Sequence, residues 1–147
     1  MEPADLARLN PKGASLSGAD LIGANLAQAI LREADLTEAD LREATLSGSV
    51  LRESILDSAS LYGASLKDAN LVGASLSKAL LKKADLANVD FTRANLFGAD
   101  LEEAIAAGTG AAAGARDRPG SPPRARGRVH APRLLQPGGR QGDGAPA

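Results

Sequence analysis

The stretch ADLTEADLRE, residues 34–43, contains one five-residue unit twice: Ala, Asp, Leu and two variable residues. The unit continues without insertion in both directions. Every fifth residue over the range 16–101 is Leu, except Phe91, which gives 18 consecutive central positions in phase. Fixed self-similarity of this kind is the sequence signature of a repeat architecture, in which each unit stacks on its neighbours.

The five-residue period is incompatible with a regular helix or a flat strand. Five residues of α-helix turn by about 500°, so successive Leu side chains would be spread around the helix. In a strand, side chains alternate with period 2, so an odd repeat would send successive Leu residues to opposite faces. Ala, Leu, Glu and Arg favour helix locally, but 18 uninterrupted matches outweigh that preference. The period therefore predicts a chain that turns a corner within each repeat.

The unit resembles the A(D/N)LXX pattern of the pentapeptide-repeat family, and the resemblance covers residues 14–104. It implies an all-β fold, a right-handed quadrilateral parallel β-helix (a solenoid) with four pentapeptides per coil, one on each face. Eighteen repeats then make about four and a half coils, and stacking at about 4.8 Å gives a rod roughly 22 Å tall.

The central residues are expected to fill the interior, together with the small residue two positions earlier, which is Ala except at Ser49, Ser54 and Val89. The two Ser residues would place hydroxyls inside. The predicted structural core consists of Leu16, Leu21, Leu26, Leu31, Leu36, Leu41, Leu46, Leu51, Leu56, Leu61, Leu66, Leu71, Leu76, Leu81, Leu86, Phe91, Leu96 and Leu101.

Two further positions of the repeat indicate turns. Asp, Asn, Ser or Thr stands before most central residues, where a short polar side chain can accept a hydrogen bond from the turn backbone. Gly recurs two residues after the centre, as at Gly18 and Gly23, where a corner needs a positive φ. We interpret the regular carboxylates as structural or solvated and not as catalytic.

The chain divides into three parts. Residues 1–13 are a lead-in or cap, in which Pro11 interrupts the phase, and residues 14–105 are the repeat body. Residues 106–147 are rich in Arg, Gly, Pro and Ala without a period, and this composition predicts a disordered tail. Residues 1–105 carry ten Lys or Arg against sixteen Asp or Glu, net −6, whereas the tail carries seven Arg against two Asp, net +5.

No catalytic or cofactor site can be assembled from the sequence. The chain contains no Cys, which excludes disulfides and thiolate metal sites. Its single His, His130, lies in the tail, so no Ser-His-Asp set forms on the body. The spacing of Gly18 and Gly23 is that of a P-loop, but Ala and Asn follow instead of Lys and Ser or Thr. We expect no enzyme activity, no cofactor and no metal.

Outward apolar residues suggest a surface for a partner. The candidate interaction surface consists of Ile22, Ile30, Val50, Tyr62 and Phe97. Ile30 and Val50 are 20 residues apart and so fall in one column of the implied fold. Clustered apolar side chains on a surface mark protein interaction sites.

Two functions follow from these features. The first is a non-enzymatic scaffold or protein-interaction module, because repeat architectures present extended binding surfaces. The second follows from the family resemblance: some members are acidic rods that resemble DNA and inhibit or protect DNA gyrase or topoisomerase. An acidic body permits this, but Lys and Arg are mixed into it.

The expected partner is a protein of unknown identity. We expect no direct sequence-specific binding to nucleic acid, although the Arg-rich tail has the charge for non-specific contact. No secretory segment and no membrane-length apolar run occurs in the sequence, so the expectation is a cytoplasmic protein. We expect it to be a monomer or a homodimer.

Overall fold

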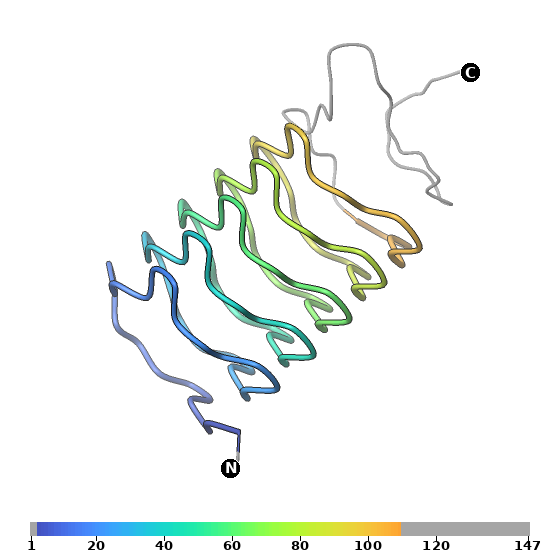
Figure 1. Cartoon of the computed structure of the whole chain (residues 1–147). Coiled ribbons are helices and arrows are strands. Elements are labelled where there is room, and N and C mark those ends of the chain that lie inside the picture. Colours follow the sequence, from blue (N-terminus) through green and yellow to red (C-terminus); the bar gives the residue numbers. More distant parts are fainter. Residues whose placement is uncertain (1–2, 110–147) are drawn as a thin grey trace, which may run out of the picture.

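The computed structural model describes residues 3–109, and over this range the chain winds as a right-handed quadrilateral parallel β-helix (Figure 1). Within this range no helix occurs and no strand is longer than one bridging residue. All sixteen bridges are parallel and join residues 20 apart, such as Asp20 to Asp40. Twenty residues make one coil of four pentapeptides, so the predicted fold class is confirmed.

The backbone of each repeat is bonded to both neighbouring coils. In the repeat centred on Leu36, the Leu36 N–H donates to the carbonyl of Ile55 in the next coil at 2.7 Å, and the Glu38 N–H donates to Asp57 at 2.9 Å. The N–H of the residue before the centre donates to a carbonyl of the preceding coil. The N–H of the residue two before the centre donates to the carbonyl of the preceding central residue, which closes a turn. In the described coils away from the first and the last, the N–H of the residue after the centre is the one N–H of each repeat that has no backbone acceptor.

Four faces, named A to D, follow from this winding. Each face is a stack of pentapeptides whose bridging residues are 20 apart. The bridging column of face A is Asp5, Asn25, Thr45, Ser65, Asp85 and Ile105, and that of face B is Ile30, Val50, Asn70 and Asp90. The column of face C is Ser15, Asp35, Ile55, Ser75 and Asn95, and that of face D is Asp20, Asp40, Ser60, Leu80 and Asp100.

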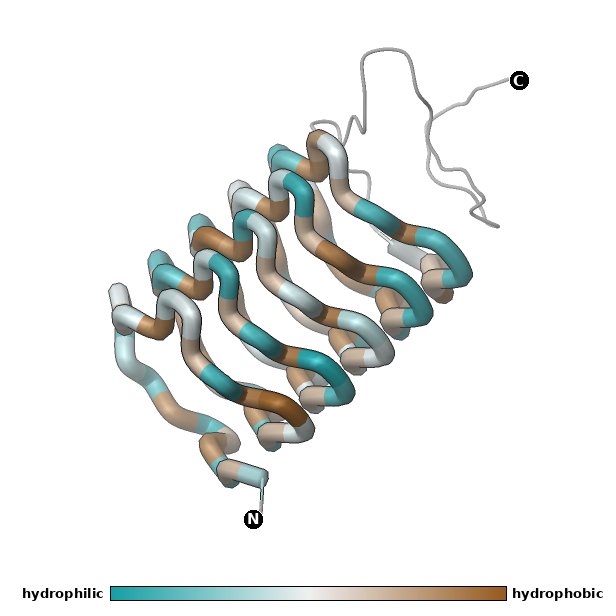
Figure 2. The backbone as a smooth tube through the Cα atoms, in the orientation of Figure 1, coloured by the Kyte–Doolittle hydropathy of each residue, from teal (hydrophilic) through white to brown (hydrophobic). Residues whose placement is uncertain are grey.

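The interior of the coil holds the central side chains. The sixteen central residues from Leu21 to Leu96 are buried, whereas Leu16 and Leu101, near the two ends, are only partly buried. Apolar segments recur at the same place in successive coils, which stacks them along the rod (Figure 2). Because each interior position repeats in every coil, the core is continuous from end to end.

The corners force a left-handed backbone at every repeat. All 21 residues two after a centre, from Arg8 to Gly108, have φ between 58° and 75°, and only eight of them are Gly. The predicted positive φ of the corner glycines is confirmed. Thirteen other residues adopt the same conformation, at a cost of roughly 1–2 kcal/mol each. The inter-coil ladder and the buried core therefore override local preference at these corners.

The coil extends over both predicted boundaries. Asp5 bridges to Asn25, so the described part of the lead-in, residues 3–13, lies on the next coil, although Pro11 has no N–H to donate to the ladder. At the other end, the Asn88 N–H donates to Ala107 at 2.9 Å and the corner at Gly108 is formed. The predicted tail lies outside the described residues from position 110 onward.

Candidate interaction surface

Seven of the nine Asp side chains in the described part of the rod are engaged in its turns. The one backbone N–H that the ladder leaves over, on the residue after the centre, donates to the Oδ1 atom of an Asp or Asn placed before the centre. Ten side chains accept in this way at 3.0–3.3 Å: Asp5, Asp20, Asn25, Asp35, Asp40, Asn70, Asp85, Asp90, Asn95 and Asp100. The predicted bonding of these residues to turn backbone is confirmed, and it explains why the repeat prefers Asp or Asn.

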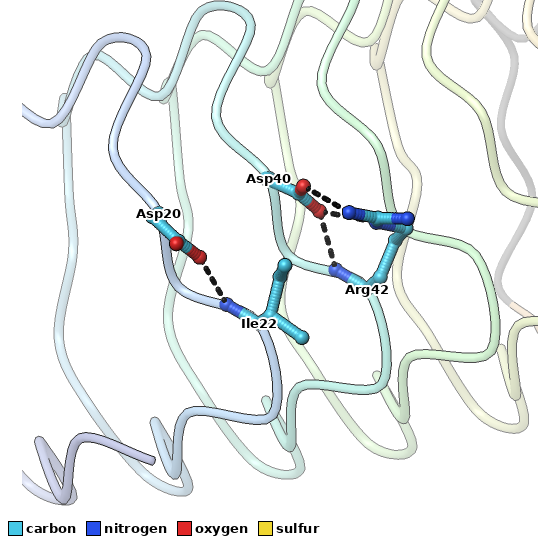
Figure 3. Close-up of polar contacts among 4 residues, drawn as sticks. All are labelled: Asp20, Ile22, Asp40 and Arg42. Carbon is cyan, nitrogen blue, oxygen red and sulfur yellow. Dashed lines mark hydrogen bonds and ion pairs between the residues drawn. The ribbon is translucent and has the colours of Figure 1, made fainter. Parts of the chain in front are cut away.

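Two neighbouring coils on face D show this turn with and without an added ion pair (Figure 3). Asp20 accepts only the N–H of Ile22, at 3.2 Å. Asp40 accepts the N–H of Arg42 at 3.3 Å and also its guanidinium, with Nε to Oδ1 at 2.8 Å and Nη2 to Oδ2 at 2.7 Å. The Arg42 guanidinium thereby lowers the pKa of Asp40. The Arg42 side chain is exposed and that of Asp40 is half-buried, so the pair lies at the surface.

A Ser–Asp arrangement on face C is structural in the same sense. Ser75 stands where other repeats have Asp or Asn, and the carboxylate comes from the coil below: Asp57 Oδ1 accepts the Ser77 N–H at 3.0 Å. The Ser75 hydroxyl donates to the same oxygen at 2.5 Å. No His lies in the part of the chain that the structure describes, so the pair is not extended into a Ser-His-Asp set.

The five candidate surface residues do not form one patch. Ile22 and Tyr62 lie in one column of face D, on either side of Arg42, and both are exposed. Ile30 and Val50 are adjacent on face B but half-buried. The fifth, Phe97, lies on face C and is 49% exposed, with no second exposed apolar residue beside it in its column.

Leu80, which is not among the five candidate residues, lies beside Tyr62 on face D. It bridges to Ser60 and therefore lies one coil beyond Tyr62 on the same face, and it is 47% exposed. The signal was present as a spacing of 20 residues from Ser60, which the four pentapeptides per coil implied by the family resemblance place in one column. Five of the seven large apolar residues that are exposed within 3–109 lie on faces C and D: Ile22, Ile55, Tyr62, Leu80 and Phe97.

The net charge of the rod is confined to the same two faces. The described repeats of faces A and B carry six acidic and six basic residues, so they are neutral. Those of faces C and D carry nine acidic and four basic residues, a net charge of −5. The acidic members are Asp20, Asp35, Glu38, Asp40, Glu43, Asp57, Asp100, Glu102 and Glu103, and the basic ones are Arg42, Lys78, Lys82 and Lys83.

Two further kinds of feature are absent from the described residues, a metal-binding group and a membrane-spanning helix. Over positions 3–109, no group of three or more His, Cys, Asp or Glu side chains is arranged to hold a metal ion. Nor does that range contain a helix of the length and hydropathy needed to cross a bilayer. His130 and the seven Arg residues of the predicted tail lie outside the range.

Comparison with solved structures finds several similar chains. HetL, a pentapeptide repeat protein involved in heterocyst differentiation regulation in the cyanobacterium Nostoc sp. strain PCC 7120, is 35% identical; the match covers 72% of this chain and 54% of HetL, with a TM-score of 0.42. A pentapeptide repeat protein of the Arabidopsis thaliana thylakoid lumen is 32% identical, covering 66% of this chain and 61% of that one, with a TM-score of 0.39.

A third similar structure is QnrB1, a plasmid-mediated fluoroquinolone resistance protein, which is 21% identical over 70% of this chain and 66% of its own, with a TM-score of 0.35. The present chain spans only a little over half the length of HetL. No protein with a curated description matches it.

The repeat itself decides the family. The family model for pentapeptide repeats matches in eight copies, over residues 4–32, 12–48, 34–71 and 69–105. These segments together run from residue 4 to residue 105, which is well over half of the chain. The period, the four-sided coil and this match agree, and the chain belongs to the pentapeptide-repeat family.

Proposed function

We propose that the protein is a non-enzymatic scaffold that binds another protein through faces C and D. One observation carries the proposal: these two faces hold the whole net charge of the described rod and also five of its seven exposed large apolar side chains. Faces A and B are neutral. A partner with a basic, partly apolar contact surface fits this distribution, because complementary charge steers association and apolar anchors hold it.

Surface variants on face C test the proposal with little risk to the fold. Ile55 is 41% and Phe97 49% exposed, so the double variant Ile55→Ser/Phe97→Ser should fold normally. A matched control on face A is Lys67→Ser/Ala87→Ser. The full chain and both variants would be used to capture proteins from a lysate of the source cells, with quantitative mass spectrometry. We expect the face C variant alone to lose its specific partner, and equal capture by all three proteins would refute the assignment of the surface.

DNA mimicry toward gyrase or topoisomerase is a second candidate, supported by the net charge of −5 on two adjacent faces. Four cations on the same faces, among them Arg42 and Lys82, interrupt the negative surface. A supercoiling assay with purified gyrase separates the two candidates. Inhibition, or relief of quinolone inhibition, that is lost on reversing Glu38 and Glu43 to Lys would support mimicry, and an unchanged supercoiling rate would reject it.

A further inference from the structure

The charge on face D changes sign along the rod. Three stretches, 38–43, 58–63 and 78–83, lie on successive coils, because their bridging residues are 20 apart. The first stretch carries three carboxylates and one Arg, the middle one carries no charge, and the third carries three Lys and no carboxylate. Over these three coils the face therefore changes from negative through neutral to positive, and the coil beyond them, 98–103, is acidic again.

The unpaired part of this charge lies in the two corner columns that border the face. One corner has Glu38 and Lys78, two coils apart, and the other has Glu43 and Lys83, each pair separated by a small residue. All four side chains are exposed, and within residues 3–109 none of them belongs to an ion pair. Lys83 places its Nζ atom 5.9 Å from the ring centre of Tyr62, on the neutral coil.

The other charges on these coils are already compensated within the chain. Asp40 binds the guanidinium of Arg42 at 2.7 Å, and Lys82 Nζ lies 2.8 Å from Glu102 Oε1. The side chains free to meet a partner are therefore the corner Glu and Lys residues, with exposed Tyr62 and Leu80 between the columns.

We propose that the protein forms a homodimer in which face D of one copy packs antiparallel on face D of a second copy. The two-fold axis runs parallel to stretch 58–63, between the two faces and perpendicular to the rods. Each corner column then faces the same column of the second copy, with the order of coils reversed. Glu38 then opposes Lys78 of the second copy, and Glu43 opposes Lys83. The symmetry doubles these two contacts to four, and Tyr62 faces Tyr62 of the second copy at the centre.

The two corner columns favour a second copy over an unrelated partner because they are self-complementary over these three coils. Between the columns, Arg42 opposes Lys82 of the second copy, and each of these cations is already in an ion pair with a carboxylate of its own chain. The negative and positive coils lie about 10 Å apart, at about 4.8 Å per coil, and equally far from the neutral coil between them. An acidic or basic partner would be attracted by one coil and repelled by the other. At the middle of the two corners stand the small residues Ser58 and Gly63, and the Glu43 carboxylate lies over Gly63. The dimer goes beyond the proposed scaffold function and narrows it: face D is covered in the dimer, so the other protein would bind face C, whose described repeats carry three acidic residues and one basic residue.

Complementary charge reversals in the full chain test the pairing directly. The variant Glu38→Lys/Glu43→Lys has Lys on both coils and should dimerise about 100-fold more weakly than the unchanged protein, because like charges then meet at four places. The variant Lys78→Glu/Lys83→Glu has Glu on both coils and should fail equally. An equimolar mixture of the two should restore the dimer as a heterodimer, read by sedimentation velocity with one variant carrying a larger fusion tag.

A matched double reversal on another face serves as the control. Glu33→Lys/Glu53→Lys changes two corner carboxylates of face B, which lies away from the proposed contact. This variant should dimerise as the unchanged protein does. Far-ultraviolet circular dichroism and thermal unfolding of each variant establish that the coil is intact, so a lost dimer can be assigned to the contact and not to unfolding.

Two single-cysteine variants locate the two-fold axis. The chain has no Cys, so a single introduced thiol can be oxidised only against a second copy. Ser60 and Ser65 are half-buried bridging residues on faces D and A. Ser60→Cys should give a disulfide-linked dimer on mild oxidation, and Ser65→Cys should not. Four outcomes would each overturn the proposal: a monomer at all concentrations, a dimer that neither charge reversal weakens, a mixture of the two variants that stays monomeric, or equal cross-linking of the two thiols.

Discussion

Replacing Ser49 by Ala should stabilise the protein, which is unusual for a change in a core. Ser49 stands at a position where most repeats have Ala; it is 1% exposed, and its Oγ atom is the one buried side-chain oxygen or nitrogen within residues 3–109 without a hydrogen-bond partner. A buried hydroxyl without a partner costs about 1–3 kcal/mol relative to its hydrated state in the unfolded chain. Because Ala fits the equivalent site in other coils, the substitution removes that cost without leaving a cavity that the fold cannot accept.

Ser54 provides a matched control, one repeat later. It is equally buried, but its hydroxyl donates to the Leu51 carbonyl at 2.7 Å. That carbonyl also accepts the Ser54 N–H at 3.1 Å, so Ser54→Ala leaves no orphaned acceptor. The loss is then that of one ordinary hydrogen bond, about 0.5–1.5 kcal/mol. The two substitutions are chemically identical and should change the free energy of unfolding in opposite directions.

Equilibrium unfolding in urea and thermal unfolding followed by circular dichroism measure both effects. For a domain near 100 residues, 1 kcal/mol shifts Tm by roughly 4–8 °C, so Ser49→Ala should raise Tm by at least about 4 °C and Ser54→Ala should lower it. The reasoning is refuted if Ser49→Ala leaves Tm unchanged or lowers it, because the hydroxyl would then have a partner in solution.

Three further predictions concern the core, the turns and pH. Leu61→Asp places an unpaired charge at a fully buried site and should abolish the cooperative unfolding transition, whereas Arg42→Ala, on the surface, should change stability by less than about 0.5 kcal/mol; equal tolerance of both would contradict the inward orientation of the central residues. Asp35→Ala removes the acceptor of the Thr37 N–H at 3.0 Å and should cost about 1 kcal/mol in urea unfolding, while Asp35→Asn keeps the acceptor and should cost clearly less; equal losses would mean that the turn bond contributes nothing. The hydroxyl and N–H of the neighbouring Thr lower the pKa of Asp35 and of Asp90 from the ordinary 3.8. A lowered carboxyl pKa contributes stability that is present above pH 3.8 and lost as the pH falls through the folded-state pKa, so Tm should fall below about pH 4, and a Tm independent of acid would oppose this account.

The sequence predicted the interior and the turn chemistry because both repeat with the period. A residue such as Leu61 faces inward whatever the number of residues in a coil, since the corner in each repeat turns every centre the same way. The Asp and Asn side chains act two residues along the chain, as Asp35 does on Thr37, so their bond is local and visible in sequence. The positive φ at corners was expected for Gly, but the ladder imposes it equally on Glu38 and Lys83.

The outward surface was predicted less well. Five apolar residues were grouped because they all point outward, but Ile30 and Phe97 lie on different faces. Their neighbours across coils are 20 residues away. The period alone does not give that number, although the family resemblance implies it and correctly placed Ile30 and Val50 in one column. Likewise the ion pair of Lys82 joins residues in successive coils, with Glu102 as its partner.

By itself, then, the sequence determined that the chain turns at every fifth residue, that the apolar central residues fill the inside, and that short polar side chains complete the turns. These properties depend on contacts within one repeat or on a period that every repeat obeys. Only the tertiary structure decided which outward residues share a face, that the net charge lies on faces C and D, and that Glu38 and Lys78 stand at mirrored distances from one neutral coil. Those properties depend on the closure of four pentapeptides into one coil. Hydrogen bonds between coils set this closure, and it cannot be read from any single repeat.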